Sequence, residues 1–180
     1  MTVHALVPHK SGATQACTVL ARVELLPGAV RFEYRLAGAT SLVAIPRRAA
    51  PRRAGRLWEH TCFEAFIAPA SRAGYCELNF SPSTEWAAYA FDGYREGMRE
   101  LRLSAPPAIA VAETADELRV TAALELGALG DAPWPWRIGL TAVVEDPAGE
   151  REYFALRHPR EKPDFHDAAA FTVLLDGSAR

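Results

Sequence analysis

The amino-acid sequence predicts a single domain of the all-β class, an antiparallel β-sandwich of about ten strands. Short segments with alternating or continuously apolar patterns recur along the chain, and turn residues separate them at regular spacing. No stretch has the pattern of a long amphipathic helix. A length of 180 residues suits one domain with a sizeable core, so residues 1–180 are expected to form one unit.

The N-terminal part of the chain supplies the first strands. Residues 16–25 are rich in apolar side chains and end at a turn formed by Pro27 and Gly28. Residues 30–36 alternate apolar and charged side chains, which predicts a strand with one buried and one exposed face. A further short strand is expected over residues 41–45.

Five arginines lie within residues 47–56, a segment that Pro51 and Gly55 interrupt. These interruptions predict a loop rather than a helix. The clustered guanidinium groups could bind a phosphate or a carboxylate, because arginine matches the geometry of both groups. We favour a solvated loop instead. An RNA-binding patch is the least favoured interpretation, because no aromatic residues are interleaved with the arginines.

The centre of the chain contains three β-forming segments in a row, at residues 57–67, 74–81 and 85–91. Side chains alternate across a strand, so each segment has two faces. With a turn near Ala70, the expected polar face consists of His60, Cys62, Glu64, Glu77, Asn79, Ser81 and Trp86. The expected core face consists of Phe63, Ala65, Ile67, Leu78, Phe80, Ala87, Tyr89 and Phe91. A polar face of this composition is unusual for a merely solvated sheet, so we interpret it as the floor of a ligand site.

The C-terminal half continues the strand pattern. Further strands are expected at residues 109–113, 118–124, 137–145, 152–158 and 171–175. The first two of these form a hairpin. A loop is expected over residues 92–98, a single helical turn over residues 125–130, and a polar loop over residues 159–170.

The composition argues against several classes of function. The formal net charge is −2, which gives no bulk attraction to nucleic acid or to an anionic membrane. No run approaches a membrane span, and the N-terminus lacks the apolar stretch of a secretory signal. The cysteines Cys17, Cys62 and Cys76 have no C-x-x-C spacing and are expected to be reduced thiols. A cytoplasmic location is therefore expected.

Several motifs give the sequence a family resemblance. They are LWEHTCFE (residues 57–64), YCELNFSPS (75–83), WAAY (86–89), YREGM (94–98), YFAL (153–156), His158 and PDFH (163–166). With these motifs, residues 57–175 resemble the DOMON-like domain family related to type 9 carbohydrate-binding modules. The resemblance implies a jelly-roll-like β-sandwich that binds a ligand on one face without transforming it. Characterised relatives bind sugars between aromatic side chains, or hold haem through a methionine and a histidine. Phe154 stands where relatives have tryptophan, so an aromatic contact there would have a smaller face.

The residues expected to contact a ligand combine the polar face with the motif residues. They are Trp58, His60, Glu64, Glu77, Asn79, Ser81, Trp86, Arg95, Phe154, His158, Asp164 and His166. Trp86 is the leading candidate for stacking on a sugar ring, because its expected neighbours are polar or small, and Trp58 is second. Trp134 and Trp136, flanked by prolines, are expected to pack from a loop onto the core. The favoured function is non-catalytic binding of a small ligand, a saccharide or a cell-wall-type glycan fragment.

Two other classes of function remain open from the sequence. Glu64 and Glu77, expected opposite each other, could act as the carboxylate pair of a sugar-acting enzyme. An arginine bridge between the two acids, from Arg95 or Arg157, is the interpretation we favour over catalysis. No cofactor is expected, but His60, His158 and His166 with Cys62 could supply zinc ligands, and Met98 with His158 or His166 could ligate haem.

Overall fold

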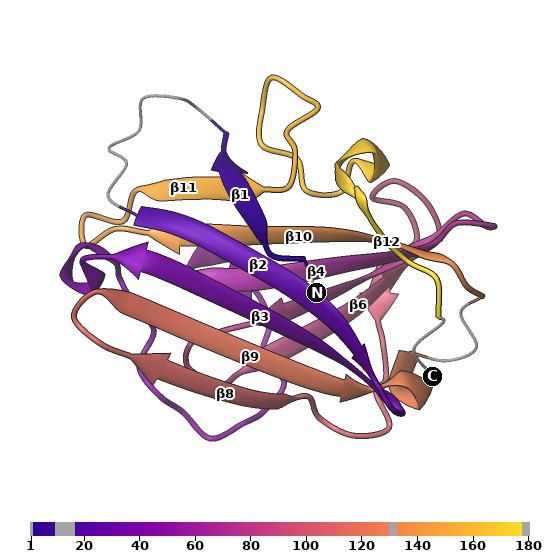
Figure 1. The fold of residues 1–180 in the computed structure, drawn as a ribbon, viewed down its shortest axis with the longest axis horizontal. Coiled ribbons are helices and arrows are strands. Elements are labelled where there is room, and N and C mark those ends of the chain that lie inside the picture. The colour runs from indigo at the N-terminus through magenta and orange to yellow at the C-terminus, as the bar shows by residue number, and fades with distance from the viewer. Residues whose placement is uncertain (1, 10–16, 130–132, 178–180) are drawn as a thin grey trace.

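Two antiparallel sheets pack face to face in the computed structural model, which describes residues 2–9, 17–129 and 133–177 (Figure 1). Sheet I contains, in order, β2 (Cys17–Leu26), β3 (Ala29–Gly38), β9 (Glu117–Glu125) and β8 (Ala108–Glu113). Sheet II contains, in order, β11 (Arg151–Ala155), β10 (Trp136–Glu145), β4 (Cys62–Pro69), β5 (Tyr75–Phe80), β6 (Trp86–Phe91) and β7 (Arg99–Glu100). The prediction of an all-β, antiparallel fold is confirmed.

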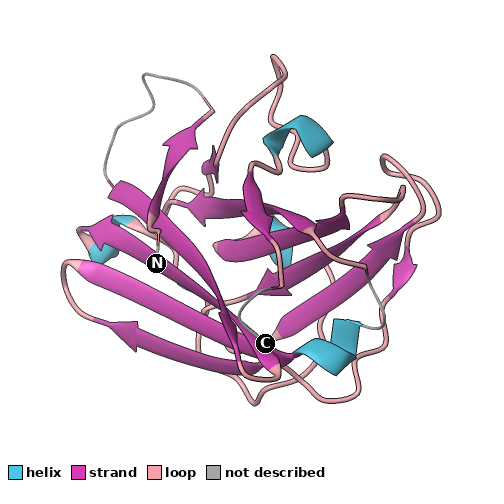
Figure 2. Ribbon diagram, turned by 45° about the vertical axis from the view of Figure 1, so that its right-hand side comes forward, coloured by secondary structure: helices cyan, strands magenta, loops and turns pink. Residues whose placement is uncertain are grey.

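Two short strands complete the architecture. β1 (His4–Pro8) pairs with β2 on one side and with β11 on the other, so it joins the two sheets. β12 (Val173–Leu175) pairs with the first residues of β10. The remaining regular structure of the described residues is four 3-10 helices: η1 (Thr40–Leu42), η2 (Leu57–Glu59), η3 (Leu126–Leu129) and η4 (Ala168–Ala170) (Figure 2). Among the described residues, no helix is long and apolar enough to cross a membrane.

The core lies between the two sheets, and the alternation in β3 shows why. Val30, Phe32, Tyr34 and Leu36 point inward and are fully buried, whereas the charged residues between them face outward. From sheet II the inward residues include Phe63, Leu78, Phe80, Ile138 and Leu140. Tyr34 crosses the core, stacks on Phe63 at 5.1 Å between ring centroids, and donates its hydroxyl proton to the backbone oxygen of Glu64 at 2.6 Å. One aromatic side chain therefore ties sheet I to the strand at the centre of sheet II.

The register of β4 and β5 keeps the predicted faces but shifts the predicted pairs. Glu64 lies opposite Asn79, and Glu77 lies opposite Phe66, so the expected direct Glu64–Glu77 pairing is wrong. The shift amounts to two residues because the turn is centred beyond Ala70. A two-residue shift preserves the side-chain alternation, so Glu64 and Glu77 remain diagonal neighbours on one face.

The predicted faces of β6 are reversed. Phe80 pairs with Trp86 and Leu78 pairs with Ala88, so Trp86 and Ala88 face the core. Ala87, Tyr89 and Phe91 occupy the face predicted to be polar. The cause lies in the connection from Ser81 to Glu85, where Thr84 adopts a left-handed conformation with φ of 75°. A turn one residue different in length moves every following side chain to the other face of the sheet.

Other local predictions were also wrong. Residues 57–61 form η2 and a bend rather than the start of a strand, and η1 replaces part of the short strand expected over residues 41–45. The strands β1 and β7 were not predicted. The helical turn expected over residues 125–130 is present as η3, and residue 130 lies outside the described residues.

The arginine segment, residues 47–56, runs along the fold and makes contacts within it. Arg53 donates to the carbonyl oxygens of Ala88 at 2.9 Å and Leu101 at 2.6 Å, and its guanidinium lies 4.5 Å from the centroid of the Trp86 ring. Arg48 donates to the backbone oxygen of Val111. Arg52 and Arg56 form ion pairs with Glu85 and Glu59, respectively. The segment is therefore anchored to the protein, and the expected freely solvated loop is only partly correct.

Candidate ligand-binding site

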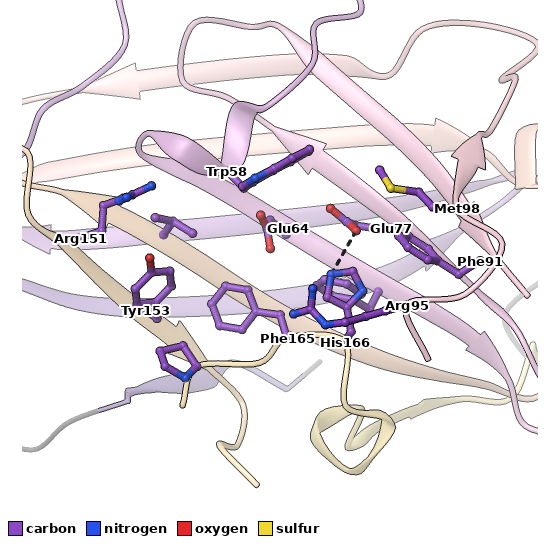
Figure 3. A pocket seen from close by; sticks show the side chains of 13 residues that line it. Trp58, Glu64, Glu77, Phe91, Arg95, Met98, Arg151, Tyr153, Phe165 and His166 are labelled. Carbon is purple, nitrogen blue, oxygen red and sulfur yellow. Dashed lines mark ion pairs between the residues drawn. The ribbon is translucent and has the colours of Figure 1, made fainter. Parts of the chain in front are cut away.

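The outer face of sheet II forms a second cluster of buried side chains, separate from the core between the sheets. Because side chains alternate along β4 and β5, Cys62, Glu64 and Phe66 point away from the core, as do Glu77 and Asn79. Two loops cover this face, one over residues 92–98 after β6 and one over residues 159–170 after β11. The covered face contains a pocket (Figure 3).

The pocket has a volume of about 350 Å³. It is lined by Trp58, Glu64, Phe66, Glu77, Phe91, Arg95, Met98, Val143, Arg151, Tyr153, Pro163, Phe165 and His166. These residues come from β4, β5, β6, β10, β11, η2 and the two covering loops. Figure 3 shows the carboxyl groups of Glu64 and Glu77 at the centre of the pocket, with Arg151 at one end and with Arg95 and His166 close beside Glu77.

Glu64 is an ionisable group in a nearly solvent-free position. The residue is 2% exposed, and the hydroxyl of Thr141 on β10 donates to its Oε2 at 3.1 Å. Burial raises the pKa of Glu64 well above its usual range, and the neighbouring charge of Glu77 raises this pKa further. The hydrogen bond from Thr141 acts in the opposite direction but does not outweigh burial.

Glu77 is similarly buried and electrostatically linked to Glu64. Burial raises the pKa of Glu77, while the side-chain amide of Asn79, which donates to Oε1 at 2.8 Å, and the charge of Arg95 lower it. Two carboxyl groups in one low-dielectric site resist being ionised together. The pocket floor can therefore donate a proton from one carboxyl group and accept hydrogen bonds with the other.

The tautomer of His166 follows from its hydrogen bonds. The backbone N–H of Arg95 donates to the Tyr75 hydroxyl oxygen at 3.2 Å, and the same hydroxyl lies 2.7 Å from Nδ1 of His166. Burial lowers the pKa of His166 to about 4, and Arg95 contributes in the same direction, so the ring is neutral at pH 7. We therefore assign the Tyr75 proton to the bond with Nδ1 and the imidazole proton to Nε2, which lies 3.8 Å from Oε2 of Glu77.

Asp164 ties the two covering loops together at the mouth of the pocket. The guanidinium of Arg95 donates to its Oδ1 at 3.0 Å, and the Tyr94 hydroxyl donates to its Oδ2. Arg160 approaches Oδ2 at 3.5 Å and lies 4.8 Å from the centroid of the Tyr94 ring. Burial raises the pKa of Asp164, but the bonds from Tyr94 and Arg95 outweigh it and the pKa is lowered. Arg95 is thus paired with Asp164, and not placed as the predicted bridge between Glu64 and Glu77.

The loop over residues 92–98 has a constrained backbone. Arg95 adopts a left-handed conformation with φ of 56°, which is sparsely populated for residues other than glycine. Gly97 has φ of 63°, and a Cβ atom there would collide with the carboxylate of Asp92. Glycine at this position lets the loop close tightly, so the Arg95 side chain reaches the pocket.

The fold is similar to that of proteins of known structure that are described as carbohydrate-binding. The crystal structure of a "putative carbohydrate-binding protein" from Bacteroides uniformis ATCC 8492 matches with a TM-score of 0.69 at 15% sequence identity, over 96% of this chain and 84% of that chain. A family 9 carbohydrate-binding module from Caldicellulosiruptor kristjanssonii, in complex with glucose, matches with a TM-score of 0.52 at 10% identity, over 92% of this chain and 78% of that chain. The chain has a family 9-like fold. No family model and no curated protein sequence matches it.

Within this family 9-like fold, the structure brings five of the predicted site residues together in the pocket. They are Trp58, Glu64, Glu77, Arg95 and His166. Two more predicted residues contact this group: Asn79 donates to Glu77, and Asp164 accepts from Arg95. Sequence reasoning therefore located the floor and one rim of the pocket.

The other predicted residues lie elsewhere. Trp86 and Phe154 are 7% and 2% exposed within the core between the sheets, so the leading stacking candidate is on the opposite face from the pocket. His60 is exposed and pairs with Glu145 at 2.8 Å. Ser81 is buried and bonded to Ser83, and Nε2 of His158 bonds to the backbone oxygen of Val7.

The candidate zinc ligands do not form one cluster, whereas two of the candidate haem ligands share the pocket. His60, His158 and His166 have separate hydrogen-bond partners, and Cys62 is fully buried beside Asn79. In the part of the chain that the structure describes, no group of three or more His, Cys, Asp or Glu side chains could hold a metal ion. Met98 and His166 both line the pocket, whereas His158 does not.

Several lining residues were not predicted. Phe66 follows directly from the alternation that places Glu64 on this face, so the sequence contained its signal. Phe91 was assigned to the core because of the reversed faces of β6. Arg151, Tyr153 and Phe165 reach the pocket only through the tertiary fold, together with Val143 and Pro163. The predicted packing of Trp134 and Trp136 onto the core is present, but Trp136 belongs to β10 and not to a loop, and Trp134 stacks on it with ring centroids 3.9 Å apart.

Proposed function

We propose that this pocket binds a small saccharide, or a cell-wall-type glycan fragment, without transforming it. The observation that carries the proposal is the pairing of the Trp58 ring with the hydrogen-bonding floor of Glu64 and Glu77 in one pocket. A pyranose ring has apolar C–H faces and polar edges, so it matches an aromatic wall beside buried polar groups. The pocket volume falls within the range of small-molecule sites.

The position of Trp58 supports this role. η2 presents the indole at the pocket, where it contacts Tyr89 edge-to-face at 5.9 Å between ring centroids. The residue is only partly buried, and it lines the pocket, so part of it is accessible to a ligand. The family 9-like fold adds support, because the similar proteins are named for carbohydrate binding and one holds glucose. The relation to DOMON-like domains, which the sequence motifs suggest, belongs to the same proposal.

The proposal is tested by replacing the aromatic wall. Isothermal titration calorimetry with a panel of mono- and disaccharides should identify a ligand, and Trp58→Ala should weaken its affinity at least about tenfold, or about 1.4 kcal/mol. The matched control is Trp134→Ala, which removes an indole that does not line the pocket and should leave the affinity within about twofold. A glycan array without binding, or a Trp58→Ala variant with the original affinity, would overturn the proposal.

A second candidate function, sugar hydrolysis, is favoured by one observation. Glu64 and Glu77 are buried diagonal neighbours whose pKa values are both raised, as a general acid requires. A glycosidase would lose turnover in both Glu64→Gln and Glu77→Gln. Turnover that survives these replacements would exclude the pair as its catalytic groups.

A further inference from the structure

The pocket floor has more acidic groups than local cationic partners. Among the described residues, no lysine or arginine forms an ion pair with Glu64 or Glu77. The imidazole of His166 is neutral, and Arg95 already bonds to Asp164. Glu64 has only a hydroxyl donor, and Glu77 has only an amide donor. A buried carboxylate without a cationic partner is costly, so a cation at this position would be strongly favoured.

Aromatic rings surround the same carboxyl groups. Trp58, Phe66, Phe91, Tyr153 and Phe165 all line the pocket. In the view of Figure 3, Trp58 lies on one side of Glu64 and Phe165 on the other. Aromatic faces attract ammonium groups, and the attraction grows when the cation is shielded from water. The combination of aromatic walls and an acidic floor therefore matches a ligand with a positive charge better than a neutral one.

The two arginines of the pocket do not alter this match. Arg151 lies beyond Glu64 in Figure 3, whereas Arg95 lies beside Glu77, and its charge lowers the pKa of Glu77. The charge of Arg95 is offset by Asp164 at 3.0 Å. The centre of the pocket is therefore the acidic part, and the position where a compact cation would bind.

We propose that the floor of the pocket binds a protonated amine carried by the saccharide, so that the preferred ligand is an amino sugar with a free amine. This inference rests on the proposed function and narrows its ligand class. The ammonium group lies against Glu64 and Glu77, and the sugar ring lies against Trp58. N-acetylation removes the positive charge, so an N-acetylated sugar lacks this interaction.

Binding of the amine is coupled to the release of protons from the pocket floor. A bound ammonium group favours the carboxylate form of Glu64 and Glu77, so it lowers their raised pKa values, and any proton that either group holds in the free protein is released. A neutral sugar provides no charge to drive this release. The other titratable or charged groups near the pair are Cys62, Tyr75, Tyr89, Arg95, Arg151, Tyr153, Asp164 and His166.

The test compares four probes by isothermal titration calorimetry at about pH 6.5, where the amine of the sugar carries its proton. The probes are glucosamine, glucose, N-acetylglucosamine and ethanolamine. Glucosamine should bind at least about tenfold more tightly than each of the others. Titrations in two buffers that differ in ionisation enthalpy should show proton release with glucosamine and none with glucose.

Two variants test whether the preference for glucosamine depends on the acidic floor of the pocket. Glu77→Gln should reduce the preference for glucosamine over glucose to less than about threefold. Glu113→Gln, the same replacement on an exposed position of β8, should keep the full preference. Far-ultraviolet circular dichroism checks that both variants are folded.

The outcomes separate this inference from the proposed function. If glucose or N-acetylglucosamine binds as tightly as glucosamine, the proposed recognition of the amine is wrong. Saccharide binding itself would still stand. Ethanolamine binding as tightly as glucosamine shows that the sugar ring contributes nothing, which overturns both proposals. Absence of binding by all four probes overturns the amine inference, and the glycan array then decides whether the proposed saccharide binding also fails. If Glu77→Gln and Glu64→Gln still prefer glucosamine, then the amine does not bind at the pocket floor, and this assignment is wrong.

Discussion

At the scale of single residues, Glu64 is the most informative group in the molecule. Its backbone oxygen accepts the bond from Tyr34 across the core, while its side chain faces the pocket on the other side of sheet II. The residue thus contributes to the fold through its backbone and to the site through its carboxyl group. Because that carboxyl group is buried without a cationic partner, its ionisation opposes folding.

Replacing Glu64 with glutamine is expected to stabilise the free protein above neutral pH. A raised pKa in the folded state contributes stability that is fully present below the unfolded pKa and is lost as the pH rises through the folded pKa. The glutamine does not titrate, and its oxygen can still accept from Thr141. Glu64→Gln should therefore exceed the parent protein in unfolding free energy at pH 8. Urea unfolding measures this difference.

The pH dependence distinguishes this effect from a simple change in packing. The gain from Glu64→Gln should be smallest near pH 4 and should grow between pH 5 and pH 8. A gain that is constant with pH, or a loss at pH 8, would contradict the electrostatic account of Glu64. Glu113→Gln is the matched control, because its side chain is exposed on β8.

At the scale of strands, the sequence predicts β4 and β5 better than β6 for a physical reason. In β5, Glu77 and Asn79 alternate with Leu78 and Phe80, so only one assignment of faces buries the apolar side chains. Every residue of β6 is apolar and buried, so its two faces cannot be told apart by pattern. The left-handed conformation of Thr84 then sets the register of β6, and a threonine at this position does not indicate that conformation. For this reason the sequence predicts Trp86 on the wrong face of sheet II.

The arginine segment shows how an element without regular structure can stabilise a strand. The backbone around Arg53 pairs with the start of β6, through bonds from Ala54 N–H to Trp86 O at 2.9 Å and from Trp86 N–H to Arg52 O at 3.0 Å. The Arg53 guanidinium then covers the Trp86 ring. The local sequence suggested a solvated loop because composition alone does not reveal these distant partners.

Arg53→Ala is therefore expected to destabilise the fold. It removes two hydrogen bonds from a charged donor to backbone oxygens and the cation–π contact with Trp86, so the unfolding free energy should fall by about 2 kcal/mol or more. Arg47→Ala is the control within the same segment, because that side chain is exposed, and its effect should stay within about 0.5 kcal/mol. Urea unfolding of both variants measures the contrast, and equal effects would refute the anchoring role.

At the scale of the whole molecule, sheet II is buried on both faces. One face meets sheet I in the core, and the other is the floor of the pocket under the two covering loops. The sequence predicts the floor because its residues are close together in the chain. It does not predict that Tyr153, Phe165 and Arg151 join them, because these residues are some sixty or more positions away from the floor and approach it only when β11 pairs with β10.

Stability toward acid is a property of the whole molecule that depends on His166. This ring contacts residues from three separate parts of the chain: Phe66, Tyr75 and Phe91. Arg95, Asp164 and Glu77 are the charged groups nearest to it. Burial lowers the pKa of His166 to about 4, below the ordinary value of a histidine in the unfolded chain. The unfolded chain therefore binds more protons between pH 6.5 and pH 4, and stability is lost as the pH falls through this window.

His166→Asn is expected to remove this part of the acid sensitivity. The asparagine oxygen can accept from Tyr75 in place of Nδ1, but the side chain does not titrate. Between pH 6.5 and pH 4 the parent protein should lose about 2 kcal/mol more unfolding free energy than the variant, after allowance for partial exposure of the ring. Urea unfolding at several pH values gives the two curves. They should run parallel above about pH 7.5, where the ring is neutral in both the folded and the unfolded chain, and separate progressively below that pH. Parallel curves down to pH 4 would show that His166 is protonated in the fold without cost, and that the neutral ring assigned beside Glu77 is incorrect.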